Sequence, residues 1–191
     1  MLPIFSGLPD AAVDRIRSAI TILQAPRASE IFLEAEASDC VYFIVAGFVK
    51  VMRGDGSGQH VIAILGPGDI FGELGAILGG SRNASVIALT PCTVVRLGVS
   101  EFSHWVDTSP SVASYLVKYL ARRIVDADTQ IELFRGDIEP RLRYWLQQFR
   151  NRGLDAELVL SNAEIARMMG ASREAVSRIV SKLRAQGWPG S

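Results

Sequence analysis

The sequence predicts an α+β protein in which a strand-rich N-terminal part is followed by helices. Between Ile31 and Leu97, short apolar segments alternate with turns that contain glycine or proline, a pattern typical of a sandwich or jelly roll. The pattern changes at Ser109-Pro110, an N-cap serine and a first-turn proline, after which no glycine or proline occurs until Gly136. The predicted organisation is therefore a β-roll domain over 1–108, a long helix and hinge over 109–136, and a helical domain over 137–191.

Composition and charge narrow the class of protein. Of the 191 residues, 49% are hydrophobic and the formal net charge is zero, which indicates a globular chain. No apolar run approaches the ~20 residues of a membrane span, and the N-terminus lacks the features of a signal peptide, so a cytoplasmic location is expected. Residues 1–134 carry ten Lys/Arg and fourteen Asp/Glu, whereas residues 135–191 carry ten and six. The C-terminal part is therefore the one expected to approach a polyanion.

Residue types that hold metals or perform catalysis are sparse. Cys40 and Cys92 are far apart, each within an apolar segment, and are predicted to pack in the core. His60 and His104 are isolated, so neither a metal site nor a haem site is expected. No nucleophile, base and orienting group occur together. We therefore expect no enzymatic activity, no metal and no required cofactor.

The long predicted helix carries a regular apolar stripe. Its apolar residues alternate spacings of four and three, which is a heptad pattern sustained over about three repeats. The stripe consists of Ala113, Val117, Leu120, Ile124, Ala127, Ile131 and Phe134. This pattern favours a parallel dimer seam, and the alternative is that the same face packs on the β domain.

Phe71-Gly72-Glu73-Leu74, followed by Arg82, combines the groups that a sugar phosphate requires. Gly72 allows close approach of the backbone, Glu73 offers a carboxylate to a ribose hydroxyl, and Arg82 offers a planar fork to a phosphate. If the residues after Gly72 turn helically, their amides also point at the anion. The combination predicts a cyclic nucleotide site. The alternative is a simple β-turn beside a solvated arginine.

The C-terminal part contains a predicted helix-turn-helix. Ser161 and Glu164 form a capping box, Gly170 supplies the turn, and a second helix opens at Ser172 and stops at Gly187.

The second helix of this motif has the chemistry of a DNA-recognition helix. We predict that its first residues enter the major groove, because arginine can bind guanine bidentately and glutamate can accept from cytosine N4. The candidate DNA-binding residues are Ser172, Arg173, Glu174, Ser177 and Arg178. The alternative is a small helical domain with a solvated face of arginine and glutamate.

These two motifs together resemble transcription regulators of the cAMP receptor protein and FNR type (CRP/FNR) over nearly the whole chain. The resemblance implies a cyclic nucleotide-binding β-roll, a homodimer, and a winged-helix-type helix-turn-helix that an effector reorients. It implies cAMP first and cGMP second as effector, palindromic double-stranded DNA with TGTGA-like half-sites as target, and RNA polymerase as a further partner. It assigns the ligand to Gly72, Glu73, Leu74 and Arg82.

The chain departs from the family pattern at three places. Asn83 stands where cAMP-binding members have serine or threonine, although its amide can still donate to a phosphate. The stretch Asp126-Ala127-Asp128-Thr129 stands where adenine is read by a Thr-Ser pair, so Ala127 and the upstream Arg123 are only candidate contacts. The sequence ends at Trp188-Pro189-Gly190-Ser191, so we expect most of the wing to be missing. A regulator of the same fold that does not respond to cyclic nucleotides therefore stays open as an alternative.

Overall fold

The structure is a computed structural model that describes residues 2–54, 60–154 and 160–188. The chain divides into two compact units, residues 1–57 with 62–122, and residues 123–191 with 58–61. The division falls within the long helix, between Arg122 and Arg123. The predicted domain boundaries at 108 and 136 therefore stay predictions.

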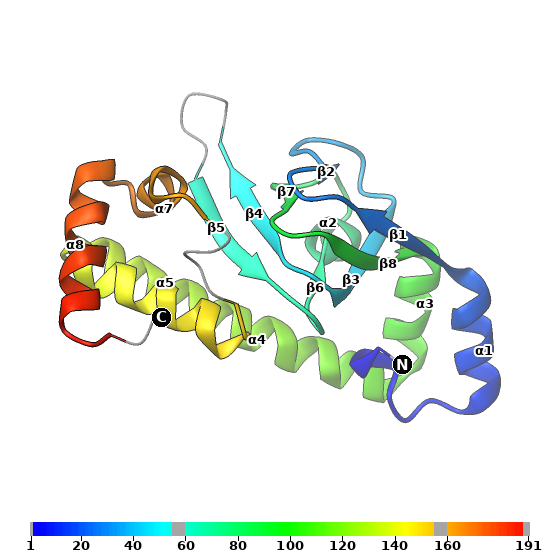
Figure 1. Ribbon diagram of the computed structural model, residues 1–191. Helices are drawn as coiled ribbons and strands as arrows, with labels where there is room; N and C mark the ends of the chain where they lie inside the picture. The colour runs from blue at the N-terminus through cyan, green and yellow to red at the C-terminus, as the bar shows by residue number, and fades with distance from the viewer. Residues whose placement is uncertain (1, 55–59, 155–159, 189–191) are drawn as a thin grey trace. The chain divides into compact units, whose positions relative to one another are not determined.

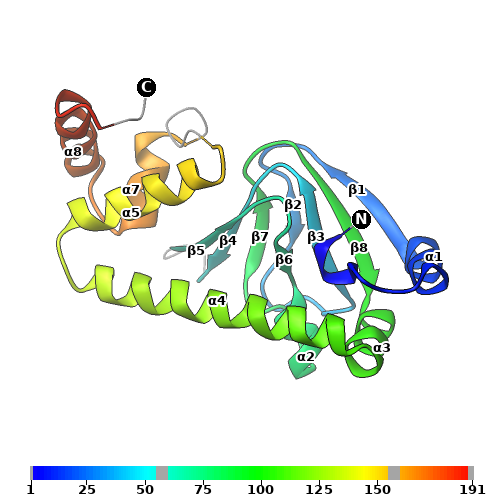
Figure 2. The same ribbon diagram turned by 90° about the horizontal axis from the view of Figure 1, so that it is seen from below.

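Two four-stranded sheets form the first unit, as the alternation of apolar segments and turns predicted. Their strand orders interleave segments distant in sequence, β1-β8-β3-β6 in one sheet and β2-β7-β4-β5 in the other, and Figure 2 shows the sheets as two layers. The first sheet contains β1 (Ile20–Ala25), β8 (Cys92–Gly98), β3 (Cys40–Ala46) and β6 (Ile70–Phe71). The second contains β2 (Glu30–Phe32), β7 (Ser85–Ala88), β4 (Val49–Arg53) and β5 (His60–Leu65).

Side-chain alternation along β3 divides the interior of this unit into two cores. Tyr42 and Ile44 point between the sheets, where they join Phe32 and Phe71. Val41 and Phe43 belong to the other core, on the outer face of the first sheet. Each face of this sheet is thus covered by apolar groups.

Both cysteines lie in the core between the sheets. Cys40 and Cys92 are buried free thiols, so the prediction that they pack in the core is confirmed.

Helices cover the outer face of the first sheet. They are η1 (Pro3–Phe5), α1 (Asp10–Ala19), α3 (Val99–Thr108) and the first part of α4 (Pro110–Phe134). Helices α1 and α3 lie side by side (Figure 1), joined by two hydrogen bonds of 2.8 and 2.9 Å from Arg15 to the carboxylate of Glu101. This pairing lowers the pKa of Glu101. Neither β1 nor α3 was predicted from the sequence.

Tyr119 fixes α4 to the first sheet. The Tyr119 hydroxyl accepts from the amide of Ile70 at 3.1 Å and donates to the carbonyl of Ile70 at 2.6 Å. Both backbone groups of this residue in β6 are therefore satisfied by one side chain of the long helix.

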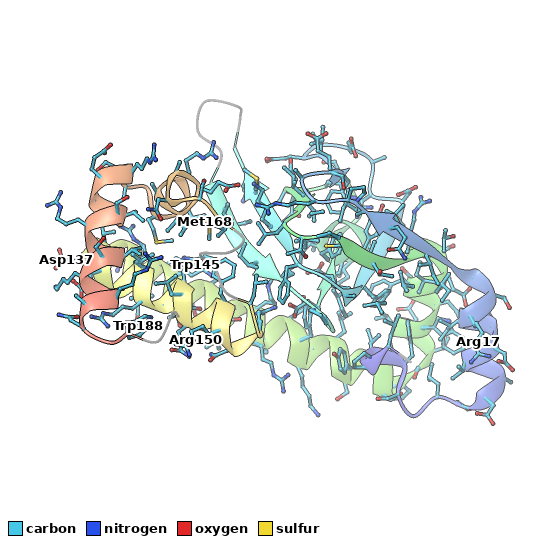
Figure 3. The ribbon with its side chains drawn as sticks, viewed as in Figure 1. Arg17, Asp137, Trp145, Arg150, Met168 and Trp188 are labelled. Carbon is cyan, nitrogen blue, oxygen red and sulfur yellow. The ribbon has the colours of Figure 1, made fainter. Side chains whose placement is uncertain are left out.

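The second unit contains α5 (Ile138–Asn151), α7 (Asn162–Met169) and α8 (Arg173–Ala185). Trp145 of α5 and Met168 of α7, labelled in Figure 3, are both buried. On the surface, Glu139 of α5 accepts from Lys182 of α8 at 2.7 Å. Asp137 stands at the N-cap of α5, but its side chain makes no capping hydrogen bond. The expectation that most of the wing is missing concerns the last residues of the sequence. Residues 189–191 lie outside the described ones, so this expectation stays a prediction.

Candidate functional sites

The glycine-glutamate cassette begins where β6 ends. Gly72 is the N-cap of the short helix α2 (Glu73–Leu78), and its φ of 77° lies in the left-handed region. A Cβ at this position would lie 2.5 Å from Nη1 of Arg82. The backbone conformation therefore favours glycine, and a side chain here would have to displace Arg82.

Arg82 is turned into the protein rather than into solvent. Its side chain is only 2% exposed. Nη1 donates to the carbonyl of Gly72 and to the hydroxyl of Ser38, both at 3.0 Å, and Nη2 donates to the sulfur of Cys40 at 3.2 Å. The alternative of a solvated surface arginine is therefore excluded.

Aromatic rings and a carboxylate complete the surroundings of Arg82. The guanidinium carbon lies 4.2 Å from the ring centre of Phe32 and 5.6 Å from that of Tyr42, positions at which the ring quadrupole attracts a cation. Asp39 lies 3.6 Å from Nη2. Nε has no hydrogen-bond partner among the described residues. Arg82 thus carries one buried donor that no described protein group satisfies.

The surroundings of Arg82 shift the pKa values of two neighbouring groups, Asp39 and Tyr42. A hydrogen bond from the thiol of Cys40, together with Arg96 at 2.6 Å, lowers the pKa of Asp39. Burial raises the pKa of Tyr42 to about 12. Asp39 is thus held ionised and Tyr42 neutral beside the arginine.

The other predicted ligand residues are divided between the two units. Glu73 is buried, with 5% exposed, Leu74 is 36% exposed and Asn83 is exposed. Arg123, half-buried, and Ala127, exposed, belong to the second unit. The structure therefore brings Gly72 and Arg82 into contact, while the roles of Arg123 and Ala127 stay predictions.

The heptad stripe of α4 is exposed along much of its length. Val117, Ile124 and Ile131 are 67, 62 and 55% exposed, and the side chain of Phe134 lies outside the described ones. Leu120, another member of the stripe, is half-buried and packs with Leu116 and Tyr119 against the core on the first sheet. Part of the stripe therefore packs on the sheet, while Val117, Ile124 and Ile131 are exposed in the single chain.

The helix-turn-helix forms as the sequence predicts. Ser161 and Glu164 make both hydrogen bonds of a capping box, and Gly170 ends α7 in the left-handed conformation with φ 58°. Ser172 caps α8 by accepting from the amide of Ala175 at 3.1 Å.

Three of the predicted DNA contacts are exposed on α8. Arg173, Glu174 and Arg178 are exposed. Ser177 differs, because it is half-buried and its hydroxyl accepts from Nδ2 of Asn162 at 3.0 Å. Ser177 therefore links the two helices of the motif, a role that its position on one helical wheel did not indicate.

Sequence reasoning missed the residues that surround Arg82 from the start of β3 and from the loop before it. Ser38, Asp39 and Cys40 lie more than forty residues before Arg82 in the chain, so no local spacing connects them. Among the described residues, no group of histidine, cysteine and acidic side chains is arranged to hold a metal ion. In the same part of the chain, no helix is long and apolar enough to span a bilayer.

A β-roll with such a cassette, joined by a long helix to a helix-turn-helix, defines a transcription regulator with an effector-binding domain. Two family models match the chain in this order: the cyclic nucleotide-binding domain over residues 22–109 and the Crp-like helix-turn-helix domain over residues 140–189. The chain belongs to the CRP/FNR family of transcription regulators.

Relatives and solved structures agree with this assignment. The chain is 30% identical over 187 residues to the cyclic AMP receptor protein of Thermus thermophilus, covering 97% of this chain and 87% of that protein. It is 29% identical over 194 residues to the CRP-like cAMP-activated global transcriptional regulator of Mycobacterium tuberculosis, with the same coverage. The structure of CLP, a c-di-GMP responsive global regulator of Xanthomonas campestris, matches with a TM-score of 0.73 at 20% identity, covering 94% of this chain and 93% of that one. The last match supports the fold.

Proposed function

We propose that this protein is a dimeric DNA-binding transcription regulator whose DNA affinity is set by a cyclic nucleotide, cAMP first and cGMP second. The observation that carries this proposal is the contact between Arg82 and the carbonyl of Gly72, which fixes a buried cation directly at the cassette. A cyclic nucleotide brings one phosphate charge to that cation. The relative from Thermus thermophilus is a cyclic AMP receptor protein, and that from Mycobacterium tuberculosis is a cAMP-activated regulator. Both support the choice of ligand.

Each cassette residue has a distinct part in this proposal. Arg82 binds the phosphate, Gly72 allows the ligand to approach the backbone, and Glu73 accepts from the ribose hydroxyl. Asn83 donates to the phosphate from its exposed position, and Leu74 contacts the apolar part of the ligand. Arg123 and Ala127 are the proposed contacts on the base side.

Dimerisation is proposed through the exposed stripe of α4. Val117, Ile124 and Ile131 leave more than half of each side chain in water in the single chain. Pairing the same stripe of two copies removes this apolar surface from water, as in a parallel coiled coil.

DNA recognition is proposed through the N-terminal end of α8. Arg173, Glu174 and Arg178 are exposed there, and Ser172 caps the same end. A dimer presents two such helices, which fits a palindromic target with TGTGA-like half-sites in cytoplasmic DNA. RNA polymerase is the further partner that we propose.

One observation favours a second candidate, a regulator of the same fold that ignores cyclic nucleotides. Both terminal nitrogens of Arg82 already donate to protein groups. An arginine held in this way can serve the stability of the β-roll alone. In that case the cassette is retained as structure and another metabolite, or none, controls DNA binding.

Calorimetry on the full chain with cAMP, cGMP and c-di-GMP separates these candidates. The c-di-GMP arm is included because the structural relative CLP responds to that nucleotide. We expect saturable cAMP binding, weaker cGMP binding, and a loss of affinity of about 10- to 100-fold in Arg82→Lys, which keeps the charge but not the fork. Arg96→Ala is the control, because Arg96 pairs with Asp39 at 2.6 Å and is 45% exposed.

The outcomes of this calorimetry are distinct. Absence of heat with all three nucleotides at millimolar concentration, in a protein that still binds DNA, refutes the effector proposal and supports the second candidate. Equal affinity losses in Arg82→Lys and Arg96→Ala contradict the role of Arg82 in holding the phosphate.

A further inference from the structure

An apolar cavity of about 600 Å³ opens in the first unit, on the outer face of the first sheet. It lies between the N-terminal segment, α1, and strands β3 and β8. Its apolar lining includes Leu2, Phe5, Val13, Ile16, Val45 and Val95. None of the described residues that line it belongs to the cassette, so it is a separate site.

The lining leaves apolar surface in contact with water. Phe5, Ile16 and Val95 are buried, but Val45 is 49% exposed, and Val13 is half-buried. A ligand with an apolar body would cover this surface and gain the hydrophobic driving force of its removal from water. The volume falls within the range of small-molecule sites, about 300–1,000 Å³.

One charge stands at this cavity. Arg17 of α1, labelled in Figure 3, is the one charged side chain among the described lining residues. Its partner is Asp14 at 3.2 Å, and the two side chains are 74 and 70% exposed. Such an exposed pair is weak, so a ligand carboxylate can compete with Asp14 for the guanidinium. We infer that the cavity binds an apolar monocarboxylate, with its apolar body against Val13, Val45 and Val95 and its carboxylate at Arg17.

The wall of the cavity is connected to the cassette along the chain, through strand β6. The lining turn at Pro67 and Gly68 is tied to β3, because the amide of Gly68 donates to the carbonyl of Ile44 at 2.9 Å. Two residues beyond Gly68, Ile70 holds the hydroxyl of Tyr119, and Gly72 follows. A ligand that displaces this turn therefore alters both the cassette and the anchorage of α4. This effect on the cassette rests on the proposed function, whereas binding of the carboxylate in the cavity does not.

Binding is tested on the full chain without nucleotide, by calorimetry with dodecanoate, 1-naphthaleneacetate and the uncharged dodecanol. The two carboxylates distinguish a fatty acid from an aromatic acid. We expect one saturable site per chain for at least one carboxylate. Val45→Trp, which fills the cavity from a solvent-exposed position, should abolish it. Ile22→Trp is the matched control, because Ile22 is 63% exposed on β1 and does not line the cavity.

The charge is tested by Arg17→Gln. This change should weaken carboxylate binding about two- to fivefold and leave dodecanol unaffected. Failure of both carboxylates to bind, or equal binding to the parent protein and Val45→Trp, overturns the inference.

Coupling between the cavity and the cassette is tested by repeating the cAMP titration in the presence of the carboxylate that binds. We expect a changed cAMP affinity in the parent protein and no change in Val45→Trp. An unchanged affinity in both refutes the coupling. Because carboxylate binding is measured without nucleotide, a protein that fails to bind cAMP still gives a clear result for the cavity.

Discussion

Gly72→Ala is the sharpest test of the packing at the cassette. An alanine at φ 77° costs about 1–2 kcal/mol for the left-handed backbone. Its Cβ would also lie 2.5 Å from Nη1 of Arg82. Nη1 is the end of a flexible side chain, but it donates to two partners at 3.0 Å, and displacing it loses a charge-assisted bond worth about 1.5–3 kcal/mol. The expected loss of unfolding free energy is therefore about 2.5–5 kcal/mol.

Gly170→Ala provides the matched control for this substitution. Gly170 has φ 58° and ψ 40°, also left-handed, but an added Cβ there meets no atom within 4 Å. Gly170→Ala should therefore lower the free energy of unfolding only by the cost of the left-handed backbone, about 1–2 kcal/mol. The measurement is equilibrium urea unfolding followed by circular dichroism, with each value taken from the transition of the unit that carries the change. Equal losses in the two variants would refute the close packing of Arg82 on Gly72.

The remaining predictions concern DNA, the dimer and pH. Arg173→Ala should cost about 1–3 kcal/mol at one base pair and relax specificity there, and an equal loss on random DNA in binding assays would contradict base reading. Ile124→Lys should dissociate the dimer in analytical ultracentrifugation. Val125→Lys should not, because Val125 is similarly exposed, at 63%, but lies off the stripe. A parent protein that sediments as a monomer would contradict the proposed dimer seam on α4. Because the pKa of Tyr42 is raised to about 12 in the fold, its contribution to stability is present below the unfolded value of about 10. That contribution is lost as pH rises through 12, a loss that Tyr42→Phe should remove in alkaline unfolding.

The features that the sequence predicts well are those set within a few residues. The capping box at Ser161 and Glu164, and the turn at Gly170, depend on hydrogen bonds and dihedral angles inside one short segment. The turn residues between strands similarly predict the β-roll. For the same reason, the unusual backbone conformation of Gly72 could be predicted from the sequence.

Features set by distant contacts could not be predicted in this way. Two partners of Arg82, Ser38 and Cys40, come from the loop before β3 and from the start of that strand. The hydrogen bond between Asn162 and Ser177 joins residues fifteen positions apart. Strand β1 shows no alternation, because only Ala25 at its end is buried. Helix α3 has just two buried residues, Phe102 and Trp105, too few to show a helical period.

The two hydrogen bonds between Tyr119 and Ile70 fix α4 to the first sheet at one point along the helix. One hydroxyl holds both backbone groups of Ile70, so the helix cannot slide along the sheet without losing two buried hydrogen bonds at once. The helix continues for fifteen residues to Phe134, about 22 Å at 1.5 Å per residue. A tilt of about 5° about Tyr119 would move the far end of the helix by about 2 Å.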